Sequence, residues 1–401
     1  MDRRFATFTL AAALATACAL AAAPAHAQRG KDQAVIAMTL EPPGLDPTAG
    51  AASAIAEITL YNIYETLTKI GADGQPRPLL AERWTVSPDL KTWTFRLRGD
   101  AAFHNGAAFD SAAVKFSFER AGAQGSTNKD RAVFANIASI DTPDARTAVL
   151  NLKNGDPDLL FKLGQATAII VEPGSVASNA TQPVGTGPYR LEAWARGSSV
   201  TLARWDAWRA AKDVKLRRVT IRFINDPAAQ IAALLSGDVD AFPRVAAARS
   251  LKQFEGNRRF QVLIGGSRAK TILAMNNKRP PLNDVRVRRA IYAAIAREAV
   301  IQGAADGFGV PIGSYYVPGA PGYVDLKDVN PHDVAKARAL LHQAGFALPL
   351  ELVMKLPPTP YARQGGEVIA AMLDKVGIKA KIENVEWAQW LSGVYGQKAY
   401  D

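Results

Sequence analysis

The sequence predicts a multidomain α/β protein, and three observations lead to that prediction. The chain has 401 residues, 48% hydrophobic and 21% charged, which is enough apolar side chain for two or three cores. Short β-rich runs alternate with helices that carry clear start and stop signals. No repeat period and no low-complexity linker separates these elements. We therefore expect α/β domains that exchange strands at a shared hinge.

The first 27 residues have the pattern of a cleavable signal peptide. Arg3 and Arg4 precede an alanine-rich apolar run, and Ala25-His26-Ala27 supplies the small-x-small cleavage pattern. A membrane anchor of ~20 residues would usually carry more Leu and Ile. Cys18, the single cysteine, only faintly fits a lipoprotein acceptor site, and cleavage removes it. We predict export without a lipid anchor, and a mature chain without thiol, disulfide or cysteine metal site.

The positive charge of the chain does not predict a nucleic-acid partner. The formal net charge is +11, and proteins that bind nucleic acid gather such charge in a stripe with interleaved aromatic residues. The longest basic cluster, Arg286 to Arg289, instead lies on a predicted helix whose other face is apolar. We interpret it as solvated helix surface and expect no nucleic acid among the partners.

The first mature elements are a strand, a turn and a helix-prone stretch. Residues 35–40 are β-rich, residues 42–47 contain three prolines and form a rigid turn, and a helix-prone stretch continues to residue 64. Residues 92–98, TWTFRLR, alternate with a period of two, which is typical of a half-buried strand.

The stretch FHNGAAFDSAAVKFSFER, residues 103–120, has two interpretations. Its polar side chains could belong to an active site, or they could form the entry to a helix. With Asp110 as N-cap, Phe109 and Val114 take the two positions of a hydrophobic staple. His104 and the two residues after it then form a turn. No second histidine or carboxylate cluster accompanies them, so we assign them a structural role.

Later segments continue the alternation. Asp226-Pro227 opens a helix that ends near Gly237 and is followed by a strand to residue 242. A strand is predicted at residues 271–276. Leu282 and Val287 bracket Asn283 as a second staple, which starts a helix with an apolar face.

The last third predicts a helix and then a strand-helix-strand unit. Residues 330–333 start the helix, which ends at Gly345. Residues 350–355, a helix over about 363–376 and residues 380–385 form the strand-helix-strand unit.

A search for catalytic and cofactor motifs finds none that is complete. The sequence has no G-x-S-x-G elbow and no phosphate-binding G-x-x-x-x-G-K-[ST] loop. His332 and His342 are ten residues apart, not at the i, i+4 spacing of a zinc-binding helix. Gly185-Thr186-Gly187 begins like a dinucleotide loop, but Pro188 follows and the third glycine is missing. We predict no enzyme, no catalytic residue, no cofactor and no metal.

Six ordered segments show a family resemblance. They are Leu45-Asp46-Pro47, NIYETLTKIGADGQPRPLLAERWTVSPDLKTWTFRLR, FHNGAAFDSAAVKFSFER, PVGTGPYRLEAW, LAMNNKRPPLNDVRVRRAI and NPHDVAKARALLHQAGF. Through these segments, which span nearly all of the mature sequence, the chain resembles the solute-binding proteins of ABC importers, family 5, the peptide, dipeptide and nickel-binding group.

The resemblance implies a type II periplasmic binding protein-like fold, with two main lobes around a hinge cleft and one extra lobe. Residues 28–60 and 184–270 correspond to lobe I, 61–183 to the extra lobe II, and 271–401 to lobe III. The implied protein is a periplasmic monomer that captures a peptide-like solute between lobes I and III. It then delivers the solute to ABC permease subunits at the inner membrane.

Two departures from the family bear on the ligand. The relatives continue beyond the point where this chain reads YGQKAYD, so the resemblance implies a lobe III without its return to lobe I. The aspartate that holds a dipeptide's amino group there has no counterpart, and Asp401 does not replace it. Unpaired strand edges would favour aggregation if this sequence is the whole product.

The second departure concerns an arginine. Dipeptide binders carry one just before the helix near Arg363, where this chain reads KLPPTPY; Lys355 or Arg363 could replace it, or both could be surface charges. A plain dipeptide is therefore a less expected ligand. Longer peptides, glutathione-like solutes, opines, metal chelates and some sugars remain open.

Positional resemblance gives five candidate ligand-binding residues, each with a structural alternative: Ala52, Ser53, Asn276, Asn277 and Trp387. Ser53 could instead cap a helix, Asn276 could satisfy backbone groups at the hinge, and Trp387 could pack in a core. Two other functions also stay open. One is an exported hydrolase with an unrecognised site, and the other is a sensor or chaperone-like binding domain that does not transport.

Overall fold

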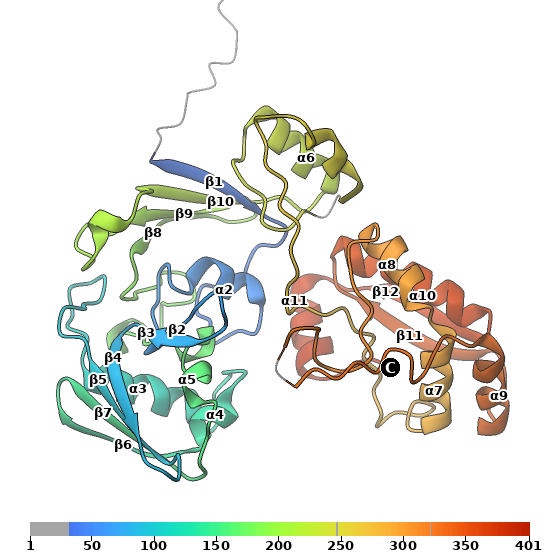
Figure 1. The fold of residues 1–401 in the computed structure, drawn as a ribbon, viewed down its shortest axis with the longest axis horizontal. Helices are drawn as coiled ribbons and strands as arrows, with labels where there is room; N and C mark the ends of the chain where they lie inside the picture. The colour runs from blue at the N-terminus through green and yellow to red at the C-terminus, as the bar shows by residue number, and fades with distance from the viewer. Residues whose placement is uncertain (1–31, 246–247, 321) are drawn as a thin grey trace, which may run out of the picture.

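The computed structural model describes residues 32–245, 248–320 and 322–401, and Figure 1 shows two bodies. The first body contains the elements from β1 to α6, and the second contains those from α7 to α11. The predicted signal peptide, with Cys18, lies outside the described residues. Within them, no helix is long and apolar enough to cross a bilayer.

One mixed sheet forms the upper part of the first body. Its strands are β1 (Gln33–Met38), β10 (Arg218–Phe223), β9 (Ser199–Arg204) and β8 (Tyr189–Ala195), in the order β1-β10-β9-β8. β1 runs parallel to β10, and the other neighbours are antiparallel. Helix α2 (Ser53–Thr59) contributes Ile58 to the core of this sheet. Helix α6 (Pro227–Ser236) packs Ala233 against Ala37 of β1 in a separate small core.

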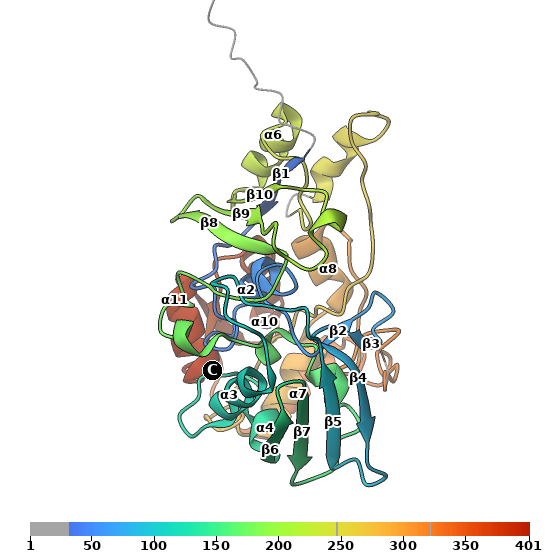
Figure 2. The ribbon, with the colours of Figure 1, turned by 90° about the vertical axis from the view of Figure 1, so that its left-hand side faces the viewer.

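A four-stranded antiparallel sheet forms the lower part of the first body, with α3 and α4 beside it in Figure 2. Trp93, Phe95 and Leu97 of the second strand are buried and alternate with partly exposed residues, so the predicted period of two is confirmed. The strands, in sheet order, are β4 (Ala81–Val86), β5 (Thr92–Leu97), β7 (Thr147–Leu152) and β6 (Ile137–Asp144). The other elements are the hairpin β2 (Thr68–Ile70) and β3 (Pro76–Pro78) and helices α3 (Ser111–Gly122), α4 (Arg131–Ala135) and α5 (Leu159–Lys162).

The start of α3 confirms the structural interpretation of FHNGAAFDSAAVKFSFER. The Asp110 side chain accepts a hydrogen bond from the Ala113 backbone N–H at 2.9 Å, as an N-cap should. Phe109 and Val114, the two staple residues, are both buried. His104 lies in the turn before the helix, where Gly106 has a φ of +88° that favours glycine.

The second body is built on a parallel strand pair. β11 (Leu350–Leu356) and β12 (Ile378–Asn384) pair in parallel through the crossover helix α10 (Pro360–Asp374), as the predicted strand-helix-strand unit requires. Helix α10 begins three residues earlier than predicted, because Pro360 takes the first-turn position that suits proline. Helices α7 (Val285–Ala294) and α9 (Val334–Ala344) share a core with the strands, and α8 (Arg297–Ala305) packs on α10.

Helix caps in the second body follow the sequence with one correction. Asp333 caps α9 and Gly345 ends it in the left-handed region, as predicted. The cap of α7 is Asp284 rather than Asn283, because the Asp284 carboxylate reaches the Arg286 backbone N–H at 2.7 Å. The apolar face of α7 is buried as expected.

Two predicted strands are wrong. Residues 271–276 form no strand, although Leu273 and Met275 pack on the core and Ile272 is 65% exposed. The side chains thus keep a period of two, but a strand also needs a paired neighbouring strand, and the described chain supplies none here. Asn276 alone donates its backbone N–H to the Asp401 carbonyl oxygen, at 2.5 Å. The predicted strand before residue 242 is likewise reduced to one bridge between Ile36 and Ala241.

Candidate ligand-binding site

A hollow of about 510 Å³ lies at the carboxyl ends of β11 and β12; we call it the strand-end hollow. Ends of parallel strands are where α/β folds place their ligands. Two segments line it, the strand ends and the helical turn that follows β12. The lining residues are Lys355, Glu383, Asn384, Val385, Gln389, Gly393 and Val394.

The register of β11 and β12 determines which charged side chains lie side by side in the strand-end hollow. Lys355 stands opposite Glu383 in the parallel ladder. The Glu383 carboxylate pairs with Lys381 at 3.4 Å rather than with Lys355. Lys355 is half-buried, and within the described chain its ammonium makes no hydrogen bond or ion pair. A half-buried ammonium without an acceptor is suited to bind a carboxylate or another anionic group.

Aromatic rings stack in the helical segment beside the strand-end hollow. Helix α11 (Trp387–Gln389) continues into a π-helical turn (Trp390–Gly396), a geometry that is frequent at functional sites. The Trp387 and Trp390 rings lie 5.6 Å apart at 10°, and Tyr395 follows at 6.2 Å from Trp390. Both indole N–H groups are shielded from solvent and lack an acceptor in the described chain. The stack offers flat apolar surface, and its two indole N–H groups point away from solvent.

None of the five predicted site residues is part of this lining. Ala52 is buried at the N-cap position of α2 and makes no side-chain cap, while Ser53 is the exposed first residue of that helix. Ser53 therefore does not cap the helix, which was its structural alternative. In Figure 1, α2 lies on the side of the first body that faces the second.

Asn276 follows its structural alternative. Its side-chain amide donates to the carbonyl oxygens of Lys398 and Tyr400, at 3.1 and 3.3 Å, and its oxygen accepts from the Lys278 backbone N–H. Asn277 beside it is exposed. Trp387 shares the helical segment that supplies Gln389 to the strand-end hollow, and the other four predicted residues lie on other segments.

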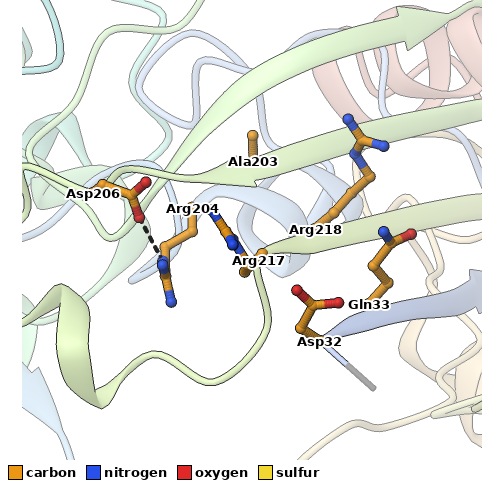
Figure 3. A pocket seen from close by; sticks show the side chains of 7 residues that line it. All are labelled: Asp32, Gln33, Ala203, Arg204, Asp206, Arg217 and Arg218. Atoms are coloured by element: carbon orange, nitrogen blue, oxygen red, sulfur yellow. Dashed lines mark hydrogen bonds and ion pairs between the residues drawn. The ribbon is translucent and has the colours of Figure 1, made fainter. Parts of the chain in front are cut away.

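A second hollow of about 390 Å³ lies at the end of the mixed sheet of the first body, and Figure 3 shows its lining. Arg204 is held by Asp206 at 2.8 Å and by the Val214 carbonyl oxygen. Arg218 is held by both carboxylate oxygens of Glu192. In Figure 3 the Arg204 and Arg218 side chains point to opposite sides, so these guanidinium groups do not converge on a common ligand.

His104 is a structural histidine. Its Nδ1 accepts from the Gly185 backbone N–H at 3.3 Å, so Nε2 carries the proton and donates to the Gly187 carbonyl oxygen at 2.9 Å. The ring also meets Trp205 edge-on at 4.9 Å. Burial lowers the His104 pKa from 6.5 to about 4. In the described residues no three His, Cys, Asp or Glu side chains gather as a metal site would need.

Sequence reasoning did not assign the polar lining of the strand-end hollow. The sequence predicts Lys355 only as a possible replacement for an arginine, and it does not predict Glu383, Asn384 or Gln389 as site residues. A signal was present, because polar residues end two consecutive predicted strands of one parallel unit.

Comparison with known families gives one extended match. Residues 75–400 match the model of the bacterial extracellular solute-binding proteins, family 5 Middle. The chain is 28% identical over 400 residues to the glutathione-binding protein GsiB of Salmonella paratyphi A, covering 98% of this chain and 77% of that protein. It is 31% identical over 336 residues to a putative ABC transporter peptide-binding protein of Brucella ovis, covering 79% of this chain and 62% of that protein.

Solved structures show the same fold. The periplasmic binding protein AgaA of A. tumefacien R10, in complex with agropinic acid, superposes with a TM-score of 0.80 at 29% identity, covering 92% of this chain and 76% of AgaA. The oligopeptide-binding protein AppA of Bacillus subtilis, in complex with a nonapeptide, superposes with a TM-score of 0.81. Its identity is 19%, with 90% of this chain and 76% of AppA covered, so it speaks for the fold alone.

Proposed function

The chain belongs to the bacterial extracellular solute-binding proteins of family 5, and from that membership we propose that it captures a small, carboxylate-bearing, peptide-like solute. Its fold is the predicted α/β fold of periplasmic binding proteins. Members of this family are the solute-binding components of ABC importers in the periplasm, and they bind rather than transform their ligands.

The strand-end hollow carries the proposal for the ligand. Lys355 brings an ammonium that has no ion pair in the described chain, although Glu383 also lines the hollow, and Asn384 and Gln389 bring amides. We propose that the Trp387–Trp390 stack, in the helical segment that supplies Gln389, adds an apolar plane. A solute with a carboxylate, amide bonds and some apolar surface matches all three. Glutathione-like solutes and opines have this chemistry, and the names of GsiB and AgaA agree with it.

The proposal includes a division into lobes and a partner. Residues 28–60 with 184–270 would form lobe I, 61–183 lobe II and 271–401 lobe III. The solute would lie between lobes I and III, with Trp387 from one side and Ala52 and Ser53 of α2 from the other. A ligand that binds the closed arrangement more tightly drives closure. A monomer exported by its signal peptide would then deliver the solute to permease subunits.

Ligand binding to the purified mature protein tests the proposal. Glutathione, an opine such as agropinic acid, and peptides of increasing length are screened by thermal shift and titrated by calorimetry. A solute at a hundredfold excess over its Kd should add about 2.7 kcal/mol to the free energy of unfolding. The bound solute should be recovered unchanged. A panel in which no solute raises Tm, or a solute recovered hydrolysed, would overturn the proposal.

Two variants locate the ligand. Lys355→Gln removes a hydrogen bond from a charged donor and should weaken binding about tenfold or more, with an unchanged Tm of the free protein. Lys212→Gln is the matched control, because Lys212 is an exposed lysine of the first body whose side chain has no partner in the described chain. Equal affinities for both variants would place the ligand elsewhere.

A further inference from the structure

The positive charge of the chain is concentrated in one stretch. Residues 258–297 hold ten Lys or Arg side chains and one Asp, which is a net charge of +9 out of the formal +11. Arg286 to Arg289, the longest basic cluster of the sequence, lies in this stretch on α7. Proposed ligand binding at the strand-end hollow does not use it.

Part of this charge is neutralised by carboxylates on neighbouring elements. Arg286 pairs with Asp284, and Arg279 pairs with Asp401 at 3.1 Å. Asp333 also lies near the end of α7, where its backbone N–H bonds to Ala293, but its carboxylate is used in capping α9.

Three of the cations on α7 and in the turn before it keep their full charge. The Arg288 guanidinium donates to the backbone carbonyl oxygens of Leu282 and Asn283, at 2.7 and 3.1 Å. Carbonyl acceptors fix the position of the group without cancelling its charge. The exposed side chains of Lys278 and Arg289 make no hydrogen bond or ion pair in the described chain.

Apolar side chains accompany these cations on the outer face of α7. Val285, Arg289 and Tyr292 follow the i, i+4, i+7 spacing of one helix face, and Arg288 lies beside Val285 at i+3. Val285 is 44% exposed and Tyr292 37% exposed. We call Val285, Arg288, Arg289 and Tyr292, together with Lys278 in the turn before the helix, the basic face of α7.

We propose that the basic face of α7 docks the protein on an anionic phospholipid bilayer. Anionic headgroups attract clustered Lys and Arg, and a tyrosine with a small aliphatic neighbour suits the interface below the headgroups. A basic patch also docks on an acidic patch of another protein. Val285 and Tyr292 favour the bilayer, because exposed aliphatic and aromatic side chains between cations suit its interface. This contact is independent of the ligand and would hold the protein close to a membrane surface.

Vesicle sedimentation of the mature protein tests the proposal. Vesicles of phosphatidylglycerol mixed with phosphatidylcholine should sediment the protein at low ionic strength, and vesicles of phosphatidylcholine alone should not. Binding should vanish in 1 M salt, where the Debye length falls to about 3 Å. The double variant Lys278→Gln with Arg289→Gln removes both cations that have no partner in the described chain. It should weaken binding about thirtyfold, because each basic side chain near such a surface contributes about a fivefold factor.

A matched control distinguishes the effect of the basic face of α7 from the effect of the protein's net charge. Arg83→Gln with Lys91→Gln removes two exposed cations from β4 and the turn before β5, in the other body, and should leave vesicle binding nearly unchanged. Equal loss in both double variants, or equal binding to both lipid compositions, would overturn the proposal. So would a Lys278→Gln with Arg289→Gln variant that still sediments with anionic vesicles but no longer binds neutral vesicles carrying the importer's membrane subunits, because the partner of the basic face would then be a protein. Solute affinity measured on the same variants reports on the proposed function separately.

Discussion

Acidification should destabilise the protein through His104. The imidazole is neutral in the fold, because Nδ1 accepts from Gly185 and Nε2 donates to Gly187. Its pKa falls from 6.5 in the unfolded chain to about 4 in the fold. Between these values the unfolded chain binds a proton that the folded one does not. Stability is therefore complete above pH 6.5 and is lost as pH falls toward 4, by about 3 kcal/mol in total.

Urea unfolding followed by tryptophan fluorescence, at pH values from 7.5 to 4, measures this loss. Carboxylates titrate in the same range, so the relevant quantity is the difference between wild type and His104→Gln. That difference should shrink by about 1.4 kcal/mol per pH unit below 6.5, because the variant has no group to protonate. His342→Gln, at an exposed position of α9, serves as the control. Parallel stability curves for wild type and His104→Gln across this range would refute the reasoning.

Two further substitutions probe how the first body is held together. Gly187→Ala should lower the free energy of unfolding in urea by about 3 kcal/mol or more, because the added Cβ would overlap the backbone carbonyl of Asn62. Gly265→Ala is the control and should be nearly neutral, because no atom lies within 4 Å of its added Cβ. Glu65→Leu should cost about 3–5 kcal/mol by leaving Arg209 buried without its bidentate partner, and adding Arg209→Met should recover most of that loss. A mild Gly187→Ala variant, or a double variant as unstable as Glu65→Leu, would contradict these assignments.

The sequence predicted those elements whose signals are local. Asp110, Asp226 and Asp333 each cap the helix expected of them, and Gly237 and Gly345 end two of these helices with positive φ. These contacts involve residues a few positions apart, so the sequence alone contains both partners. The predicted strand at residues 271–276 failed for the opposite reason. Its side-chain alternation is local, but its hydrogen-bonded neighbour must come from a distant segment.

The sequence predicts the residues of the candidate site less well than it predicts the helices and strands. Trp387 is predicted from the resemblance of its surrounding motif to the family pattern, and its role in binding stays a prediction; its helical segment supplies Gln389 to the strand-end hollow. Lys355 and Glu383 become neighbours only through the register of β11 and β12, which is fixed when the crossover helix packs. Asn276 was chosen by position, yet its amide is occupied by the backbone of Lys398 and Tyr400. Which polar groups stay free depends on contacts across more than a hundred residues of chain.

Polar contacts within the first body are stronger than those that cross to the second. Arg120 reaches back to Thr48 at 2.6 Å, and Glu65 holds Arg209 through two hydrogen bonds inside the fold. His104 joins the turn before α3 to the loop before β8 in the same way.

The polar contacts that cross to the second body are longer or more exposed to solvent than those within the first body. Asn225 reaches the Pro358 carbonyl oxygen at 3.5 Å, the limit of a hydrogen bond, and Arg249, which pairs with Asp306, has a side chain that is 77% exposed. An exposed ion pair contributes about 0–1 kcal/mol. We therefore expect the first body to move as one unit and the second body to move against it. Such a motion would bring Trp387 and α2 together around a solute without strain in either core.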